Sequence, residues 1–429
     1  MAQRTNRWLF PLAALGAAAT VRAGFSLFAA TGRRPHQMWT DSAPPVDSDE
    51  FLRPLALILG VPLLKGGTLH LLHNGDAWVE AMLADFRAAQ ASITFSVYTW
   101  APGRLSDMVF DALTERAQAG VKVRVLVDAV GGKSCPSEDI ERLRDAGGDV
   151  CVFRPFKIGK IDRFHLRNHR RAIVVDGRIA YTGGMAVADH WLGNARNEHE
   201  WRDIMARVTG CLAQNVQSAF AEMWAYVCGE VLSGAAFFPE MPSDSSQVRS
   251  LALVSSPSSE EQPLHLLFFK SFKSARERIW ITTPYFIPTQ PAIDVLTERA
   301  RAGVDVRILL PNHLTDAKAV RRAGRATFQQ LLDAGVRIFE YQPTMIHTKA
   351  LVVDSRWSII GSANMDIRST ELNEENVLGI CDQPFARELE SAFEGDLQRS
   401  IEIDPERWRK RGIAARALER VSGLLSEQY

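Results

Sequence analysis

The sequence predicts an α/β fold of two pseudo-symmetric lobes, each a mostly parallel sheet covered by helices, with the active site at the lobe interface. Three observations lead to this prediction. A block of fifteen residues occurs twice, strands alternate with long helices around each copy, and one histidine signature follows each copy. Strands separated by helices of ten or more residues are typical of helix-covered sheets, so each half of the chain should form one such unit.

The repeated block covers residues 113–127 and 296–310, and eleven of its fifteen positions are identical. Each copy indicates the end of a helix, a glycine that stops it, and a buried strand. The flanking segments match as well. We expect helix 77–90, strand 92–98, the repeated block and strand 150–154 in the first half, and helix 264–277, strand 278–284, the repeated block and strand 336–341 in the second.

The chain divides into five segments on this basis. They are an N-terminal apolar, membrane-associating segment with its linker (1–67), lobe 1 (68–236), an inter-lobe linker (237–263), lobe 2 (264–403) and a basic amphipathic C-terminal helix (404–429). Prolines and a serine-rich run favour a loop in the linker. In the last segment arginine alternates with apolar residues, a pattern of helices that lie on a protein surface or a membrane.

The N-terminal region combines positive charge with apolar residues. Arg4 and Arg7 precede an apolar run at 8–21, which Arg22 ends. A signal peptide, a poor membrane span and an interfacial helix all fit this pattern. We favour a membrane-associated segment over roughly 8–64.

Charge and composition narrow the classes of function. The 50 basic residues balance the 50 acidic residues, so the chain does not resemble a strongly basic nucleic-acid binder. Hydrophobic residues make up 46% of the chain, enough for a sizeable core. The five cysteines are scattered without a CxxC, so we expect reduced core thiols and no disulfide framework. We also expect no metal and no cofactor, since no clear metal-ligand spacing occurs.

The repeated histidine signature is the main candidate for chemistry. Each copy has a histidine, a cation two residues later and an aspartate five residues after the cation. The copies are His169, Arg171 and Asp176, and His347, Lys349 and Asp354. Because residues two apart in a strand project to the same face, each histidine and its cation should point at one spot. The aspartates lie on the opposite face, so we assign them an orienting or turn-fixing role.

Two imidazoles with nearby cations suit cleavage of a phosphodiester through a phosphohistidine intermediate. A neutral imidazole attacks phosphorus, and the other, protonated, donates to the leaving alcohol. An unperturbed histidine titrates near about 6.5, so both forms are accessible at neutral pH. Each half supplies one histidine, so the two lobes must face each other. Lys349, Arg171 and the amide of Asn364 would neutralise charge on the non-bridging oxygens.

Small residues follow each signature. Gly183 and Gly184 follow the first copy and allow close approach of the backbone to a phosphate. Ser362 and Asn364 follow the second copy and offer a hydroxyl and an amide to a phosphate oxygen. We therefore expect these four residues to bind phosphate.

Two carboxylates occupy matching places after the signatures. Asp203 and Glu375 each begin a strand, and we expect them to fix the tautomers of the histidines, the alternative being surface acids at strand ends. The other histidines have no partner in the repeat and should lie on the surface or in the core. His313, which opens a loop after a strand, and His165, just upstream of the first signature, are the best exceptions.

These residues resemble the phospholipase D superfamily, whose mark is a doubled HxKx4D signature followed by GSxN-type residues. The resemblance runs from about residue 68 to 403, and within the superfamily the chain is most similar to bacterial cardiolipin synthases. The segments that carry this likeness are 168–184, 189–193, 201–203, 341–345 and 373–376.

The resemblance implies two lobes around one active site and a phosphatidyltransferase. Such an enzyme moves a phosphatidyl group from one phosphatidylglycerol to another through a phosphohistidine and releases glycerol. The likeness further implies glycerophospholipid substrates, a membrane surface, and the bacterial inner membrane as location, with the cytoplasmic face favoured. It implies His169 as the nucleophile and His347 as the acid, although the intact second signature leaves the reverse assignment open.

One position departs from the family pattern. Arg171 stands where the family's first signature has lysine. Its guanidinium keeps the charge and can bind phosphate through two donors, but it is bulkier and planar.

Phosphatidyl transfer is the leading hypothesis for the function. Two alternatives stay open: hydrolysis by a phospholipase D or another phosphodiesterase, and a lipid-binding protein that Arg171 has inactivated. The balanced charge argues against a nuclease and against any nucleic-acid partner.

Overall fold

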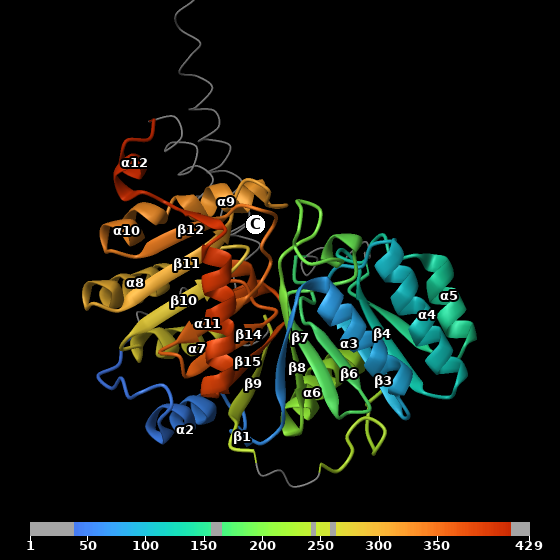
Figure 1. Cartoon of the computed structure of the whole chain (residues 1–429). Coiled ribbons are helices and arrows are strands. Elements are labelled where there is room, and N and C mark those ends of the chain that lie inside the picture. Colours follow the sequence, from blue (N-terminus) through green and yellow to red (C-terminus); the bar gives the residue numbers. More distant parts are fainter. Residues whose placement is uncertain (1–37, 156–164, 242–245, 258–262, 413–429) are drawn as a thin grey trace, which may run out of the picture.

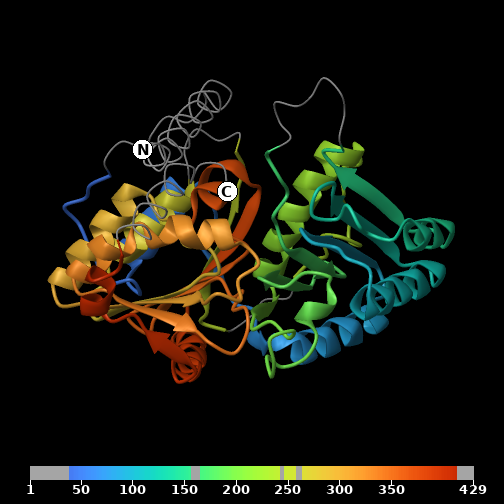
Figure 2. The same cartoon turned by 90° about the horizontal axis from the view of Figure 1, so that it is seen from above.

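The structure is a computed structural model that describes residues 38–155, 165–241, 246–257 and 263–412. A seven-stranded sheet and a nine-stranded sheet form the centres of two lobes, which lie side by side in Figures 1 and 2. Helices pack around both sheets (Figure 1). The predicted α/β fold of two lobes is confirmed.

Lobe 1 contains the seven-stranded sheet, with strands in the order β2-β8-β7-β6-β3-β4-β5. Its strands are β2 (Leu69–His73), β3 (Ser92–Val97), β4 (Lys122–Asp128), β5 (Asp149–Phe153), β6 (Ala172–Val175), β7 (Ile179–Gly183) and β8 (Ile204–Thr209). Its helices are α3 (Asn74–Ala88), α4 (Arg104–Gln118), α5 (Ser137–Asp145), the short η2 (Asp189–Trp191) and α6 (Cys211–Cys228). Trp78, Met82 and Phe86, four residues apart on α3, share one buried face, which explains why this segment is helical.

Lobe 2 repeats this arrangement as β9-β15-β14-β13-β10-β11-β12, flanked by β1 and β16. Its strands are β1 (Leu64–Lys65), β9 (Arg249–Ser255), β10 (Arg278–Thr282), β11 (Asp305–Pro311), β12 (Arg337–Tyr341), β13 (Ala350–Val353), β14 (Trp357–Gly361), β15 (Glu375–Cys381) and β16 (Ser400–Glu402). Its helices are α2 (Asp49–Ile58), α7 (Pro263–Lys273), α8 (Gln290–Arg301), α9 (Lys318–Arg325), α10 (Phe328–Asp333), the helical turn η3 (Arg368–Leu372), α11 (Gln383–Leu397) and α12 (Pro405–Arg409).

Both sheets are mixed, whereas the sequence predicted mostly parallel ones. Within the described residues, the ladders β3-β4-β5 and β10-β11-β12 are parallel, and the ladders that surround them are antiparallel. The reason is local. Tight turns after Val175 and Val353 join each signature strand to its successor as a hairpin, which needs no crossover helix.

The two lobes share part of their core. One cluster of buried side chains draws residues from both sheets, including Val174 and Ala206 of lobe 1 with Val352 and Leu378 of lobe 2. Helix α6 of lobe 1 contacts β9 of lobe 2, and helix α11 of lobe 2 contacts β2 of lobe 1. Apolar burial across this boundary therefore holds the lobes in one relative position.

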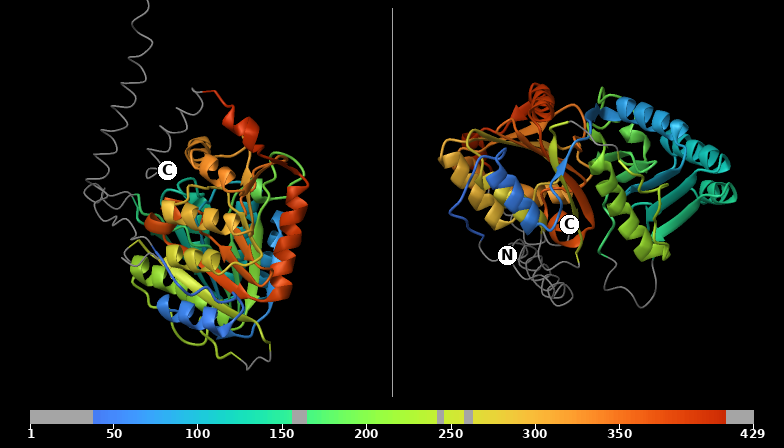
Figure 3. Two further views of the ribbon diagram at one scale, coloured as in Figure 1. Left: turned by 90° about the vertical axis from the view of Figure 1, so that its left-hand side faces the viewer. Right: turned by 90° about the horizontal axis from the view of Figure 1, so that it is seen from below.

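Part of the predicted N-terminal segment belongs to lobe 2. Phe51, Leu52 and Leu55 form the apolar face of α2 and are buried in the core of lobe 2, against which α2 lies in Figure 3. Strand β9 also falls inside the predicted linker 237–263, because its residues pair with β15 and β1. Residues 1–37 lie outside the described residues. No helix in the described ranges is both long and apolar enough to cross a bilayer.

The thiols and the C-terminus differ from the sequence-based expectations. Cys151 of β5 and Cys228 of α6 form a disulfide, so the expectation of reduced thiols fails for this pair. Their separation by 77 residues hides this proximity in the sequence.

At the C-terminus, Trp408 of α12 is buried and stacks on Phe328, so the start of the predicted helix 404–429 docks on lobe 2. Positions 413 onward lie outside the described residues.

We expect Leu55→Ala to lower the free energy of unfolding by about 2–4 kcal/mol, because it leaves a cavity in the core of lobe 2. The matched control is Leu57→Ala on the same helix, where the side chain is 80% exposed. That change should stay within about 0.5 kcal/mol in urea-induced unfolding. Equal, small effects of the two substitutions would contradict the placement of α2 in the core.

Candidate active site

Two backbone hydrogen bonds join the lobes where the signature histidines lie. The amide N–H of His169 donates to the carbonyl of Glu374 at 2.9 Å, and the amide N–H of His347 donates to the carbonyl of Arg202 at 2.7 Å. An isolated parallel bridge accompanies each contact. Each histidine is therefore anchored on the segment of the other lobe that leads into β8 or β15.

The histidines and the predicted carboxylates form pairs that cross between the lobes. Nδ1 of His169 in lobe 1 lies 2.8 Å from Oε1 of Glu375 in lobe 2. Nδ1 of His347 in lobe 2 lies 3.0 Å from Oδ2 of Asp203 in lobe 1. All four side chains are buried. A carboxylate that accepts from Nδ1 leaves Nε2 free of that bond, so Nε2 of each ring can meet a reacting atom.

Two of the residues expected to bind phosphate lie against the carboxylates, and phosphate binding by them stays a prediction. The hydroxyl of Ser362 donates to Oε2 of Glu375. In lobe 1 the indole N–H of Trp191 donates to Oδ2 of Asp203 at 3.0 Å. A side chain on Gly184 would collide with the Asp203 carboxylate. The small residues after each signature therefore make room for, or bind, the acid that orients a histidine.

The other two predicted phosphate ligands lie in different surroundings. A side chain on Gly183 would collide with the backbone of Ile204 in β8, so glycine here permits close strand packing. Asn364 is buried, and its backbone N–H donates to the hydroxyl of Ser369. Its Oδ1 accepts no hydrogen bond from the described residues. Phosphate binding by the side-chain amide of Asn364 stays a prediction.

The two signature cations lie beside their histidines and are buried. A guanidinium nitrogen of Arg171 donates to the carbonyl of His169 at 2.7 Å. Nζ of Lys349 donates to the carbonyl of His347 at 2.9 Å and lies 3.1 Å from Nε2 of the same ring. Among the described residues, neither cation forms an ion pair within 4.0 Å. Because buried charge without a counter-ion is unfavourable, this arrangement suits an anionic ligand.

The charges of each lobe act on the histidine of the other. Burial lowers the pKa of His169 well below 6.5, and Arg171 and then Lys349 of lobe 2 lower it further. Burial and Lys349 lower the pKa of His347 to about 4, and Arg171 of lobe 1 contributes. The two imidazoles therefore lie in one electrostatic environment, as a shared site requires.

The two supporting carboxylates are not equivalent. Burial raises the pKa of Glu375 to about 7. Burial also opposes ionisation of Asp203, yet the hydrogen bond and charge of His347, together with Lys349, leave the Asp203 pKa below its ordinary value. Burial lowers the pKa of Lys349 to about 7, and the charge of Arg171 adds to this. An ionised Asp203 favours positive charge on the imidazole it binds, which suits the predicted role of His347 as the proton donor.

The signature aspartates lie away from the histidines. Each accepts hydrogen bonds from three consecutive backbone N–H groups. The donors are Gln90, Ala91 and Ser92 for Asp176, and Arg276, Glu277 and Arg278 for Asp354. Each carboxylate thus fastens the start of β3 or β10 to the hairpin that follows the signature strand. This geometry agrees with the predicted turn-fixing role.

Aromatic rings that received no role from the sequence pattern surround the histidines. They are Tyr98 at 5.2 Å from His169, and Trp191, Trp201 and Tyr285 at 5.4, 5.3 and 6.2 Å from His347, measured between ring centroids. These rings exclude water from the imidazoles. The tryptophans belong to two segments that carry the family likeness, 189–193 and 201–203, so that likeness was the available signal.

The remaining candidates lie outside this cluster. His313 is exposed, and the carbonyl of His165 accepts a hydrogen bond from Arg368.

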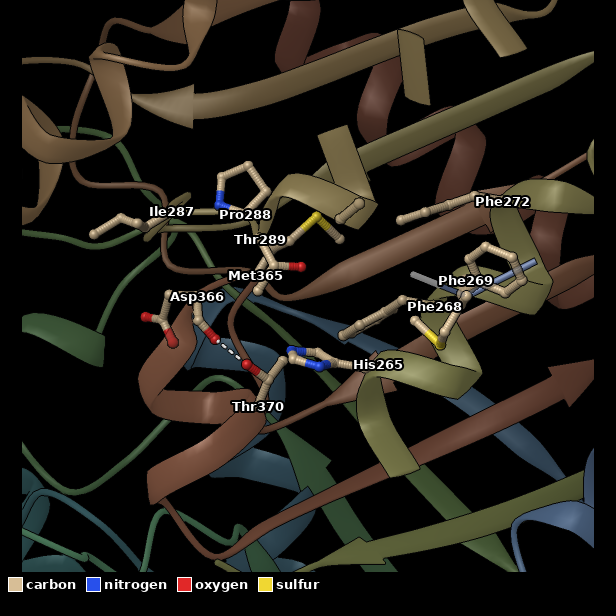
Figure 4. Close-up of a pocket in the computed structure, with 12 residues that line it drawn as sticks. His265, Phe268, Phe269, Phe272, Ile287, Pro288, Thr289, Met365, Asp366 and Thr370 are labelled. Carbon is tan, nitrogen blue, oxygen red and sulfur yellow. Dashed lines mark hydrogen bonds between the residues drawn. The ribbon is translucent and has the colours of Figure 1, made fainter. Parts of the chain in front are cut away.

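Figure 4 shows an apolar cavity of about 30 Å³ in lobe 2, where side chains of α7 face Met365 and Asp366. Such a volume admits water-sized groups only. Among the described residues, no group of three or more ligating side chains is arranged to hold a metal ion.

Comparison with known sequences gives matches over both lobes. A family model described as "Cardiolipin synthase, PLD-like domain" matches residues 82–224 and 268–397. Cardiolipin synthase 2 of Bacillus anthracis is 35% identical over 357 residues, which cover 83% of this chain and 69% of that protein. Cardiolipin synthase A of Pseudomonas fluorescens is 35% identical over 378 residues, covering 87% and 78% respectively.

Solved structures with a similar fold include a phosphatidylserine synthase of Haemophilus influenzae. It superposes with a TM-score of 0.69 over 89% of this chain and 100% of its own, at 15% identity. A polyphosphate kinase of Porphyromonas gingivalis gives a TM-score of 0.53 over 87% of this chain and 52% of its own, at 14% identity. At these identities the likeness concerns the fold alone.

We expect kcat/KM to fall as the pH rises through about 7, because Lys349 loses its proton there and no longer stabilises an anionic transition state. In Lys349→Arg the guanidinium stays protonated, so this alkaline limb should move to higher pH. The measurement is a pH–rate profile of both proteins between pH 5 and about 9. An alkaline limb that is identical in the two proteins would contradict the assignment to Lys349.

Proposed function

The chain belongs to the cardiolipin synthase family of phospholipase D-like proteins, and we propose that it transfers a phosphatidyl group between two phosphatidylglycerol molecules and releases glycerol. The crossed His169–Glu375 and His347–Asp203 pairs are the observation that carries this proposal. They present two oriented imidazoles, with Arg171 and Lys349 beside them, as double displacement at phosphorus requires.

In the first half-reaction, neutral Nε2 of His169 attacks the phosphorus of the donor lipid. The P–O bond to the glycerol headgroup breaks, and His347 gives its proton to the departing oxygen. A phosphatidyl group is then bonded to His169. The low pKa of His169 keeps its imidazole neutral, which suits a nucleophile. Arg171 and Lys349 stabilise the charge on the non-bridging oxygens.

Substrate binding adjusts the proton donor. In the free protein, burial and the charge of Lys349 hold the pKa of His347 near 4. A bound phosphodiester is an anion and offsets the charges of Lys349 and Arg171, so it raises the pKa of His347 toward protonation. Ionised Asp203 contributes in the same direction. The acid form therefore becomes accessible when the substrate is present.

In the second half-reaction, the headgroup hydroxyl of a second phosphatidylglycerol enters. Neutral His347 takes its proton, the hydroxyl oxygen bonds to phosphorus, and the P–N bond to His169 breaks. The product carries two phosphatidyl groups on one glycerol. Both substrates are membrane lipids, so the proposal places the protein at a membrane surface, the bacterial inner membrane being the expected one.

Purified full-length protein mixed with phosphatidylglycerol vesicles tests the function. Equal amounts of cardiolipin and glycerol are the expected products, measured by thin-layer chromatography and a glycerol assay. Phosphatidic acid as the main product would overturn transfer in favour of hydrolysis. No product at all would support a lipid-binding protein without activity.

We expect His169→Ala and His347→Ala each to lower product formation by at least about 10³-fold, because each imidazole is needed in both half-reactions. The melting temperature of each variant should stay near that of the native protein. His313→Ala, at an exposed position, serves as the control and should retain full turnover. Substantial turnover in either signature variant would refute a mechanism that needs two histidines.

Arg171→Lys should change kcat/KM by less than about tenfold, because lysine can make the same bond to the carbonyl of His169 and keeps the charge. Arg171→Met removes the charge and should lower kcat/KM by about 10²-fold or more. Steady-state kinetics on vesicles measure both effects. A large gain with lysine would show instead that Arg171 has impaired the native site.

A further inference from the structure

A third cation lies near His169 on the seam between the lobes, and it comes from lobe 2. Arg368 opens the helical turn η3, and a nitrogen of its guanidinium donates to the carbonyl of His165 at 2.9 Å. Farther along the same seam, the amide of Glu374 donates to the carbonyl of Arg167, and the amide of His169 donates to the carbonyl of Glu374, both at 2.9 Å. Residues that lead into the first signature thus run beside the segment that begins with Arg368.

The charge of Arg368 has no carboxylate partner among the described residues within 4.0 Å. Neighbouring arginines on the seam differ in this respect, since Arg170 forms ion pairs with Glu222 and Glu374. Arg368 is only partly buried, whereas Arg171 and Lys349 are almost completely enclosed. It is therefore a cation at the rim of the site that can still accept an anion.

The position of Arg368 is close to the reacting centre. Its charge contributes to the lowered pKa of His169, after burial, Arg171 and Lys349. It also acts on Tyr98, whose ring packs against His169 and whose side chain is partly exposed. Arg368 and Tyr98 are therefore partly exposed neighbours of His169.

The second half-reaction brings a second anion to the site. The acceptor phosphatidylglycerol has its own phosphate, separated from the attacking hydroxyl by the glycerol unit of the headgroup. When that hydroxyl reaches the phosphohistidine, two phosphates are present, and Arg171 and Lys349 already serve the first. The acceptor phosphate therefore lies one glycerol unit away from the buried centre. Water and simple alcohols, the competing acceptors, have no such group.

We propose that Arg368, with the Tyr98 hydroxyl, binds the phosphate of the acceptor lipid and so determines specificity for a phospholipid acceptor over water. This inference rests on the proposed function, because it assigns a residue to its second half-reaction. Arg368 forms and breaks no covalent bond. It positions the acceptor so that its hydroxyl oxygen bonds to phosphorus, the P–N bond to His169 breaks and the proton passes to His347.

The experiment compares acceptors that differ in charge. Full-length protein receives phosphatidylglycerol vesicles with and without 1-butanol, and cardiolipin, phosphatidylbutanol and phosphatidic acid are measured together. The variants are Arg368→Gln, which removes the charge, and Arg368→Lys, which keeps it. Arg356→Gln is the matched control, since Arg356 is a half-exposed arginine in the turn between β13 and β14 and is paired with Asp47.

We expect Arg368→Gln to lower the ratio of cardiolipin to phosphatidylbutanol by about tenfold or more, because a charge-assisted bond to the acceptor phosphate is lost. Arg368→Lys should recover much of that ratio, and Arg356→Gln should leave it unchanged. Each product depends on the same two histidines, so the ratio is insensitive to partial loss of folded protein, which melting temperatures also report.

The outcomes separate the inference from the function beneath it. Native protein that makes no cardiolipin overturns the proposed function, and the inference with it. Native protein that makes cardiolipin, with an unchanged product ratio in Arg368→Gln, overturns the inference alone, whether total turnover falls or not. An Arg368→Lys variant that behaves like Arg368→Gln also counts against a charge-based role.

Discussion

Everything in the active site depends on the exchange of partners between the lobes. Each histidine takes its orienting carboxylate and the acceptor of its backbone N–H from the other lobe, so neither lobe contains a complete catalytic unit. The shared core between α6, α11 and the two sheets keeps these contacts in register. A buried imidazole bound to a buried carboxylate is sensitive to small displacements, because an unpaired charge in such surroundings is unfavourable. The relative position of the lobes is therefore constrained by the site itself.

The two signature cations place buried positive charge beside the histidines. Arg171 and Lys349 are buried without an ion pair among the described residues, and burial lowers the pKa of Lys349 to about 7. A bound anion would stabilise this arrangement. In the proposed mechanism, a phosphodiester supplies that negative charge and at the same time shifts His347 toward the protonated form that donation requires. Substrate binding and activation of the acid are thus one electrostatic event.

The duplication is not exact, and the differences follow the two roles. Asp203 is bound by the indole of Trp191 and is ionised, whereas Glu375 is bound by Ser362 and its pKa is raised to about 7 by burial. Gly184 and Ser362 match these different acids. A side chain at 184 would collide with the Asp203 carboxylate, whereas the hydroxyl of Ser362 donates to Glu375. The two signatures thus acquire unequal histidines through the residues around them.

The sequence by itself determined the duplication, the α/β class, both signatures and the turn-fixing place of Asp176 and Asp354, because repeats, periodicity and strand parity are local properties. Only the tertiary structure decided which acid meets which histidine, that Ser362 and Gly184 serve those acids, and that α2 and β9 complete lobe 2. It also decided the disulfide between Cys151 and Cys228 and the mixed character of the sheets. The physical reason is common to all of these: they are contacts between residues far apart in the chain, and such contacts are set by how the lobes pack together rather than by the spacing of neighbouring residues.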